Sequence, residues 1–198
     1  NIEWWIIFTA CIRCGAMIAP GTTQLTSKDL EFRSNKANAA CIITTPSIAA
    51  TFDEVADKCE TVKSKIVIES AKAGWLFFDD AMKEASQEFK TAKTKAEDNC
   101  LVYFTSGTTG FPKMALHTHS YAIGHRITGK YWLDLKEIDM HWNVSDTGWA
   151  KAAWSSYFGP WNQGAALFIH HTDRFDPITT LDLLAKHPIT TMCGAPTI

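Results

Sequence analysis

Residues 103–113 form the stretch of the chain best suited to bind an anion. They read Tyr-Phe-Thr-Ser-Gly-Thr-Thr-Gly-Phe-Pro-Lys and overlap the end of an apolar run at 101–104. The stretch holds four serine and threonine hydroxyls, two glycines and, at its end, the cation Lys113. Glycine has no Cβ, so backbone N–H groups can crowd around an anion and form a nest for it. These residue types indicate a loop that binds the phosphates of a nucleotide.

Neither of the two common nucleotide motifs fits this loop. A Walker A loop needs Gly-x-x-x-x-Gly-Lys-Ser/Thr between a strand and a helix, whereas the spacing here is Gly107-x-x-Gly110-x-x-Lys113. The dinucleotide fingerprint Gly-x-Gly-x-x-Gly is also absent. The residues that follow, 114–119, alternate in the manner of a strand rather than a helix. A tight hydrophilic hairpin turn is therefore the competing interpretation on composition alone.

The loop is set in a chain of alternating predicted helices and short apolar strands. Helical spacing is found at 4–12, 27–32, 52–56, 74–89, 121–132, 147–161 and 176–184, and strand candidates at 40–44, 65–69, 101–104, 114–119, 140–145, 165–170 and 189–193. Gly15 is the expected C-cap of the first helix, Ser27 the N-cap of the second, and Pro160 the end of the sixth. The alternation predicts an α/β fold with layered, largely parallel sheets and flanking helices.

Composition excludes several classes of protein. The chain has 198 residues, 46% hydrophobic and 20% charged, as in a globular domain with a real core. A net charge of -2 argues against a nucleic-acid partner. No apolar run reaches the roughly 18 residues of a membrane span. The first residues lack the basic region and cleavage site of a signal peptide.

Cysteines and histidines do not form a convincing metal site. Cys11 and Cys14 make a lone Cys-x-x-Cys, which is either a redox or zinc half-site or, as we favour, two core residues on one helical face. We expect reduced cysteines in an intracellular compartment. His117 and His119 alternate behind the loop, and one of them is a candidate to face a nucleotide. A third metal ligand cannot be placed.

The complete string at 105–113 resembles the signature phosphate loop of the adenylate-forming superfamily, in its strand–loop–strand setting. Other stretches resemble the medium-chain acyl-CoA synthetases within it: Pro-Gly-Thr-Thr-Gln-Leu-Thr at 20–26, Trp-Asn-Val-Ser-Asp-Thr-Gly-Trp at 142–149, Pro-Trp at 160–161 with Gly164, Phe-Asp-Pro at 175–177 and Gly-Ala-Pro at 194–196. The resemblance runs from about residue 3 to the last residue. It implies that 1–198 is part of the large N-terminal AMP-binding domain of such an enzyme.

The resemblance also implies roles for particular residues. The loop would hold the β- and γ-phosphates of ATP, with Mg²⁺ sharing the work, through Thr105, Ser106, Gly107, Thr108, Thr109, Gly110, Phe111, Pro112 and Lys113. Trp149 would line or gate the acyl tunnel, whereas Trp154 is interpreted as a core residue. Gln24 lies where the family contacts the CoA end of the substrate. Asp146 is interpreted as a loop cap rather than a chemical participant.

The implied function is an ATP-dependent acid–CoA ligase. It turns a medium-chain fatty or aromatic acid into an acyl-adenylate, then transfers the acyl group to coenzyme A, typically in the mitochondrial matrix. The family's Tyr-Gly-x-Thr-Glu segment, its Thr-Gly-Asp ribose ligand and its C-terminal lid domain do not occur before Ile198. We therefore expect a fragment that contains no catalytic residue, is inactive alone and exposes strand edges.

Two alternatives remain at this stage. One is a catalytically incomplete nucleotide-binding or interaction module of the same family. The other is a relative with another acceptor, such as a peptide-synthetase adenylation domain, against which the stretches at 20–26 and 142–149 argue. The preferred acid and the oligomeric state are not predicted from these residues.

Overall fold

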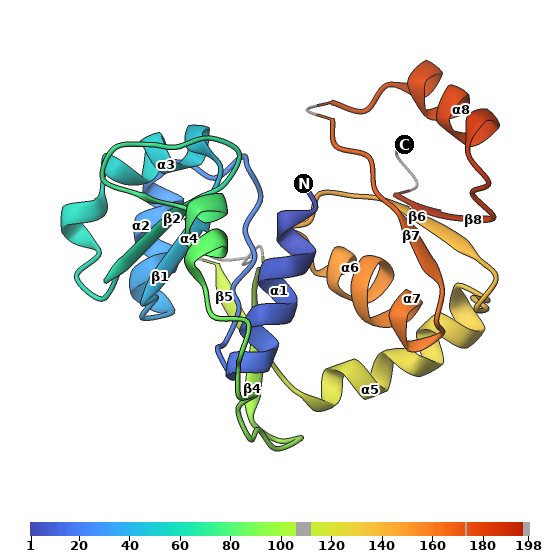
Figure 1. The fold of residues 1–198 in the computed structure, drawn as a ribbon, viewed down its shortest axis with the longest axis horizontal. Coiled ribbons are helices and arrows are strands. Elements are labelled where there is room, and N and C mark those ends of the chain that lie inside the picture. The colour runs from blue at the N-terminus through green and yellow to red at the C-terminus, as the bar shows by residue number, and fades with distance from the viewer. Residues whose placement is uncertain (106–111, 173, 196–198) are drawn as a thin grey trace. The chain divides into compact units, whose positions relative to one another are not determined.

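The computed structural model describes residues 1–105, 112–172 and 174–195 (Figure 1). The chain divides into two compact units: unit 1 is Asn1–Pro20 with Ala92–Ile198, and unit 2 is Gly21–Thr91. Within the described residues there are three sheets, two of them parallel and one an antiparallel pair. The predicted α/β fold with largely parallel sheets and flanking helices is confirmed. No helix in the described ranges is long and apolar enough to cross a membrane.

Unit 2 is a small three-stranded α/β layer. Its elements are α2 (Ser27–Lys36), β1 (Cys41–Thr44), α3 (Pro46–Asp53), η1 (Ala56–Lys58), β2 (Ser64–Val67), β3 (Leu76–Phe77) and α4 (Phe78–Glu84). The strands are parallel in the order β1-β2-β3. Helices α2 and α3 pack together beside them (Figure 1). Phe52 and Val67, both fully buried, lie in the core between these layers.

One carboxylate ties α3 to the strands of unit 2. Asp53 accepts from the Trp75 indole Nε1 at 3.0 and 3.1 Å and pairs with Lys65 at 3.0 Å and Lys72 at 2.9 Å. Burial alone would raise the pKa of Asp53, but the hydrogen bonds from Lys72, Lys65 and Trp75 outweigh it and lower that pKa. The Asp53 carboxylate is therefore stabilised in its charged form by three donor side chains.

Two predictions about unit 2 differ from the structure. The N-cap of α2 is Thr26 rather than Ser27: its hydroxyl accepts from the Asp29 N–H, and the Asp29 side chain accepts from the Thr26 N–H, a reciprocal capping box. The long helix expected over 74–89 is instead β3 followed by the short α4. Pairing of β3 with β2 overrides the helical periodicity, because Leu76 and Phe77 complete the parallel ladder.

Unit 1 carries the remaining elements. They are α1 (Glu3–Cys14), β4 (Asn99–Thr105), β5 (Lys113–Thr118), α5 (Ser120–Ile127), η2 (Thr128–Trp132), β6 (Met140–Val144), α6 (Ala150–Ala153), η3 (Trp154–Phe158), α7 (Gly159–Asn162), β7 (Ala166–Phe168), α8 (Pro177–Lys186) and β8 (Thr191–Gly194). As predicted, Asp176 caps α8, accepting from the Thr179 N–H at 2.7 Å, and Pro177 opens the helix.

The parallel sheet of unit 1 has the order β7-β6-β8, so the central strand comes first in sequence. The chain passes from β6 to β7 on one side and then crosses to β8 on the other. Parallel crossovers are right-handed, so two crossovers in opposite directions place their helices on opposite faces. Figure 1 shows α6 and α7 on one side of these strands and α8 on the other.

The core of unit 1 joins α1, β4 and the η3 segment. Phe8 lies 4.7 Å from Tyr157, centroid to centroid, and Leu101 of β4 is fully buried beside them. The Trp5 indole Nε1 donates to the Ser156 carbonyl at 2.7 Å. The Thr9 and Tyr157 hydroxyls lie 2.6 Å apart. These two hydrogen bonds, within an otherwise apolar contact, fix the position of α1 relative to η3.

Helix α1 ends as predicted, with a left-handed C-cap at Gly15 (φ 74°). None of the six cysteines forms a disulfide, and no cluster of metal-ligating side chains is found in the described ranges. Cys14 is exposed and its thiol donates to the Cys11 carbonyl at 3.3 Å. The prediction that both are core residues is therefore wrong for Cys14, because it lies at the solvent-facing end of the helix.

Two helical segments of unit 1 contain π-turns, and they touch through glycines. A Cβ at Gly129 in η2 would lie 2.5 Å from the Gly159 carbonyl oxygen, so the backbones meet directly. The Gly159 N–H donates to the Trp154 carbonyl, five residues back. Pro160 therefore lies inside a helical run that continues to Asn162 instead of ending the helix. Proline has no backbone N–H to donate. Because the π-turn changes the hydrogen-bond register just before Pro160, the missing donor does not end the helix.

Replacing Gly129 by alanine should destabilise unit 1, because the new methyl group meets backbone atoms that cannot rotate away. We expect a loss of about 1–3 kcal/mol in the free energy of unfolding, measured by urea denaturation. Gly124 is the matched control on α5, since a Cβ there meets no atom within 4 Å. Gly124→Ala should leave stability unchanged or raise it by up to about 1 kcal/mol. Equal effects of the two substitutions would contradict the contact.

Candidate nucleotide-phosphate site

The candidate loop starts and ends at two strands that pair with each other. Strands β4 and β5 are antiparallel, and Thr105 lies directly opposite Lys113. The Thr105 hydroxyl donates to the Lys113 carbonyl at 3.4 Å. Both residues are exposed. The expected strand–loop–strand setting is therefore confirmed.

The structure describes only part of the predicted loop. Thr105, Pro112 and Lys113 lie within the described residues, whereas Ser106, Gly107, Thr108, Thr109, Gly110 and Phe111 lie outside them. Lys113 forms no ion pair in the described ranges. Its ammonium group is placed at the loop's end, where it can meet an anionic ligand.

Strand β4 holds the start of the loop rigidly. Cys100, Leu101, Val102 and Tyr103 are all buried, and burial falls away only at Phe104 and Thr105. A second segment supports the strand: the Ile18 N–H donates to the Cys100 carbonyl at 2.9 Å, and the Val102 N–H donates to the Ile18 carbonyl at 2.8 Å. The loop thus follows the exposed end of a strand whose central residues are buried.

A row of contacting aromatic rings runs from β5 through α5 to η3. His117 contacts Tyr121 at 4.5 Å, Tyr121 contacts His125 at 4.2 Å, and His125 stacks on Trp154 at 6.1 Å between ring centroids. Burial, with the nearby His117, lowers the pKa of His125, and burial raises that of Tyr121 to about 12. Tyr121 and His125 therefore stay neutral near pH 7. The row was not predicted from the sequence, although the four-residue spacing of Tyr121 and His125 could have indicated that these two rings meet on one helical face.

Trp149 lies on a tight turn between β6 and α6. The residue is 59% exposed, and it is the N-cap residue of α6. Asp146 closes the turn, as its interpretation as a loop cap requires: its Oδ1 accepts from the Gly148 N–H at 2.7 Å. Trp154, interpreted as core, is half-buried against His125.

Gln24 lies in unit 2, in an exposed turn just before α2. Its backbone N–H donates to the Thr22 hydroxyl at 3.4 Å. The structure therefore places Gln24 on an accessible surface of its own unit. Gln24 belongs to unit 2, whereas Thr105, Lys113 and Trp149 belong to unit 1.

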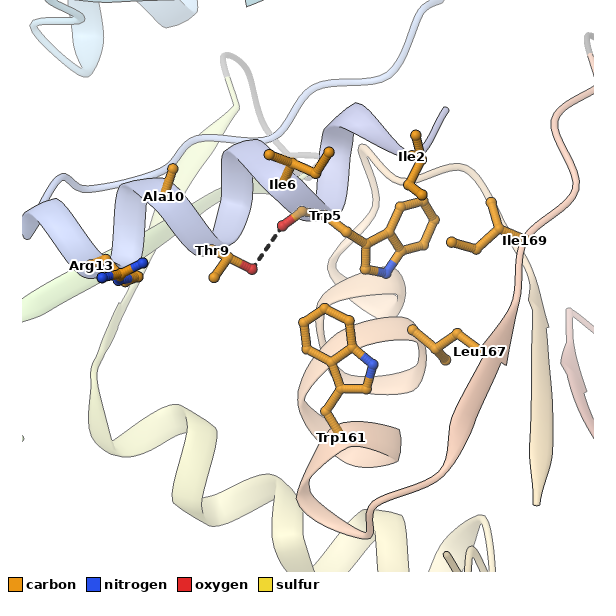
Figure 2. A pocket seen from close by; sticks show the side chains of 9 residues that line it. All are labelled: Ile2, Trp5, Ile6, Thr9, Ala10, Arg13, Trp161, Leu167 and Ile169. Carbon is orange, nitrogen blue, oxygen red and sulfur yellow. Dashed lines mark hydrogen bonds between the residues drawn. The ribbon is translucent and has the colours of Figure 1, made fainter. Parts of the chain in front are cut away.

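Unit 1 also has an apolar groove of about 590 Å³ along α1 (Figure 2). Trp5 and Thr9 of α1 lie on the side of the helix toward Trp161 of α7 and Leu167 of β7. Arg13 is the one charged residue of its lining. The lining, as formed by the described residues, contains no histidine, carboxylate, lysine, tyrosine or cysteine, the side chains that usually serve as general acids or bases, and none of the predicted site residues lines it. It is not the candidate site.

A buried polar group on β6 is equally unsuited to bind a ligand. His141 is 1% exposed, and its Nδ1 lies 2.7 Å from the Thr191 hydroxyl. Its Nε2, and the amide atoms of Asn143, have no hydrogen-bond partner in the described ranges. These atoms expose less than 1 Å² each, so no water-sized space adjoins them. A ligand needs such space.

Comparison with known proteins assigns the class. The model of the AMP-binding enzyme family matches residues 1–198. The chain therefore belongs to the AMP-binding enzymes. It is 48% identical to the acyl-coenzyme A synthetase ACSM3, mitochondrial, of Homo sapiens, over 99% of this chain and 34% of that protein. It is 44% identical to ACSM4, mitochondrial, of Rattus norvegicus, with the same coverage. The chain spans about a third of the length of these curated relatives.

Solved structures share the fold. The Brucella canis acyl-CoA synthetase superposes with a TM-score of 0.89 at 24% identity, covering 100% of this chain and 36% of that one. The anthranilate CoA ligase AuaEII, crystallised with anthranoyl-AMP, superposes with a TM-score of 0.86 at 22% identity, covering 95% and 37%. At these identities the likeness shows the architecture alone.

The ring row makes stability pH-dependent. The pKa of His125 in the folded chain lies below its usual value of 6.5, so the unfolded chain takes up the proton first as the pH falls. The free energy of unfolding should therefore decrease below about pH 6.5. Ring titration by NMR, in the folded chain and in urea, should give the lower pKa in the folded chain. Urea unfolding at two pH values should show a smaller decrease for His125→Phe. A folded pKa at or above the value in urea would contradict the effect of burial.

Proposed function

We propose that residues 1–198 are a partial N-terminal domain of an ATP-dependent acid–CoA ligase acting on medium-chain fatty or aromatic carboxylic acids. The observation that carries the proposal is the string at 105–113, whose ends the β4–β5 pair holds together, within an AMP-binding enzyme chain. The acyl-coenzyme A synthetase names of the relatives support the reaction class.

The chemistry explains why a phosphate-binding loop is needed. A carboxylate is anionic and lacks a leaving group, so its oxygen attacks the α-phosphorus of ATP. The bond from that phosphorus to the bridging oxygen breaks, and pyrophosphate leaves. The thiol of coenzyme A then attacks the acyl carbon, losing its proton and releasing AMP. Because the first step joins two anions, it depends on positioning and on neutralisation of charge.

In this proposal, Thr105 and Lys113 begin and end the phosphate cradle. The ammonium group of Lys113 would neutralise the β- and γ-phosphates, and the loop's hydroxyls and N–H groups would donate to them. Mg²⁺ would be held chiefly by phosphate oxygens, as is usual for this ion. The described residues offer no cluster of metal-ligating side chains. The ion would lower the charge of the leaving pyrophosphate.

The two other predicted contacts belong to the same proposal. The exposed ring of Trp149 would meet the acyl chain, and Gln24 would contact the CoA end of the substrate. The relatives are named mitochondrial, and we extend this to the mitochondrial matrix for the parent protein. No nucleic-acid partner is proposed.

The second candidate is a catalytically incomplete nucleotide-binding or interaction module of the same family. Such a module would retain the loop but would form no thioester.

Lys113→Ala in the full-length parent should lower kcat for adenylate formation by about 10²-fold, because one charge on the phosphates is lost. Pyrophosphate–ATP exchange measures this step. Lys113→Arg should retain more of the rate than alanine because the charge remains. Lys90→Ala, an exposed lysine outside the loop, is the matched control and should leave exchange unchanged. Unaltered exchange in Lys113→Ala would remove this lysine from the proposed cradle.

Residues 1–198 alone should catalyse neither pyrophosphate exchange nor thioester formation, since the predicted domain is incomplete. The full-length parent should form CoA esters from a ladder of fatty acids and from benzoate. Normal turnover by the 198-residue chain would show that the chemistry lies within these residues. Absence of product from the parent with every acid would reject the ligase proposal.

A further inference from the structure

A single residue, Asp146, closes the turn that carries Trp149, through its backbone carbonyl and its side chain. The Asp146 carbonyl accepts from the Trp149 N–H at 3.2 Å, and the Asp146 Oδ1 accepts from the Gly148 N–H at 2.7 Å. One residue thus binds both N–H groups that precede α6. Aspartate at the first position of a turn stabilises it in this way because its side chain repeats the backbone contact.

The orientation of Trp149 depends on this turn. Trp149 has an extended backbone (φ -90°, ψ 147°), and its carbonyl accepts the first helical bond from the Ala152 N–H at 3.0 Å. The next residues inward, Ala152 and Ala153, are fully buried, whereas Trp149 is 59% exposed. No ring contact of Trp149 is found within the described ranges. The backbone conformation at 146–149 therefore sets the direction of the Cα–Cβ bond from which the ring extends.

We propose that Asp146 is a positioning residue that fixes Trp149 and, through it, the preference for acyl-chain length. The second half of this inference rests on the proposed function, in which Trp149 meets the acyl chain. Asp146 itself touches no substrate. Removing its side chain leaves the buried Gly148 N–H without its acceptor, which frees the turn and lets the indole take several orientations. Asparagine keeps an Oδ1 acceptor at the same position, so Asp146→Asn preserves the turn.

The kinetic test uses the full-length protein and compares hexanoate with dodecanoate. The readout is the ratio of kcat/KM for the two acids, which a general loss of stability does not move. Asp146→Ala should shift the ratio in the same direction as Trp149→Ala, by about 10-fold. Asp146→Asn should keep it within about 2-fold of wild type. The double variant should match Trp149→Ala alone, because a residue that acts through Trp149 has no effect once the ring is gone.

Asp176 supplies the matched control. It is also a capping aspartate, accepting from the Thr179 N–H at 2.7 Å, but it opens α8. Asp176→Ala makes the same chemical change in another cap. It should lower the melting temperature without changing the hexanoate to dodecanoate ratio. An equal shift of the ratio in both variants would mean that loss of any cap suffices, and would overturn the proposal.

A second measurement tests the position of the ring without catalysis. In full-length protein carrying 5-fluorotryptophan, the ¹⁹F resonance missing from Trp149→Phe belongs to Trp149. It should shift or narrow in Asp146→Ala and coincide with wild type in Asp146→Asn. An unchanged resonance in Asp146→Ala overturns the positioning role.

The two measurements also separate this inference from the proposed function. If no acid gives a CoA ester, the proposed function fails, and the ¹⁹F result alone decides whether Asp146 positions Trp149. If esters form but Trp149→Ala leaves the ratio unchanged, the specificity half of the proposal is overturned.

Discussion

The antiparallel pairing of β4 with β5 is the constraint on which the candidate site depends. A loop rich in glycine and hydroxyl groups has high conformational entropy, and binding an anion with it costs the ordering of its backbone. Pairing of Thr105 with Lys113 would reduce that cost, because it already holds the two ends of the loop next to each other. Burial of β4 from Cys100 to Tyr103 makes the pairing rigid. The paired strands are therefore compatible with both interpretations of the loop, the hairpin turn and the phosphate-binding loop.

The parallel sheet of unit 1 offers a second place where a ligand could bind, at the carboxyl ends of its strands. Its central strand β6 is flanked by β7 and β8, and its neighbours are reached by crossovers in opposite directions. Ligands of open α/β sheets bind at the carboxyl ends of the strands where such a reversal occurs. The turn at 145–149 follows the carboxyl end of β6, so an exposed aromatic ring at that position lies where the topology favours a substrate.

Much of this arrangement could be predicted from local chemistry. Gly15, Asp176 and Pro177 mark helix ends through their own backbone preferences, and the apolar runs at 41–44 and 101–104 became strands. The failures have a tertiary cause. Leu76 and Phe77 carry a helical pattern, yet pairing with β2 decides their conformation. Pro160 was expected to end a helix. The helical run continues past it because a π-turn precedes it, at the point where Gly159 contacts Gly129, which is distant in sequence. For the site, motif and setting could be predicted, whereas the ring row of Tyr121 and its neighbours depends on packing between β5, α5 and η3.

The contact between Gly129 and Gly159 has a mechanical consequence for Trp149. Where two helical segments meet backbone to backbone, neither can slide or roll without driving a side chain into the other. The helical run that follows Trp149 is therefore fixed near its C-terminal end by this contact. The exposed Trp149 lies at the N-terminal end of the same run. Displacement of the Trp149 backbone therefore has to originate in the residues before the helix, at 145–148, whereas the ring itself turns about its own side-chain bonds.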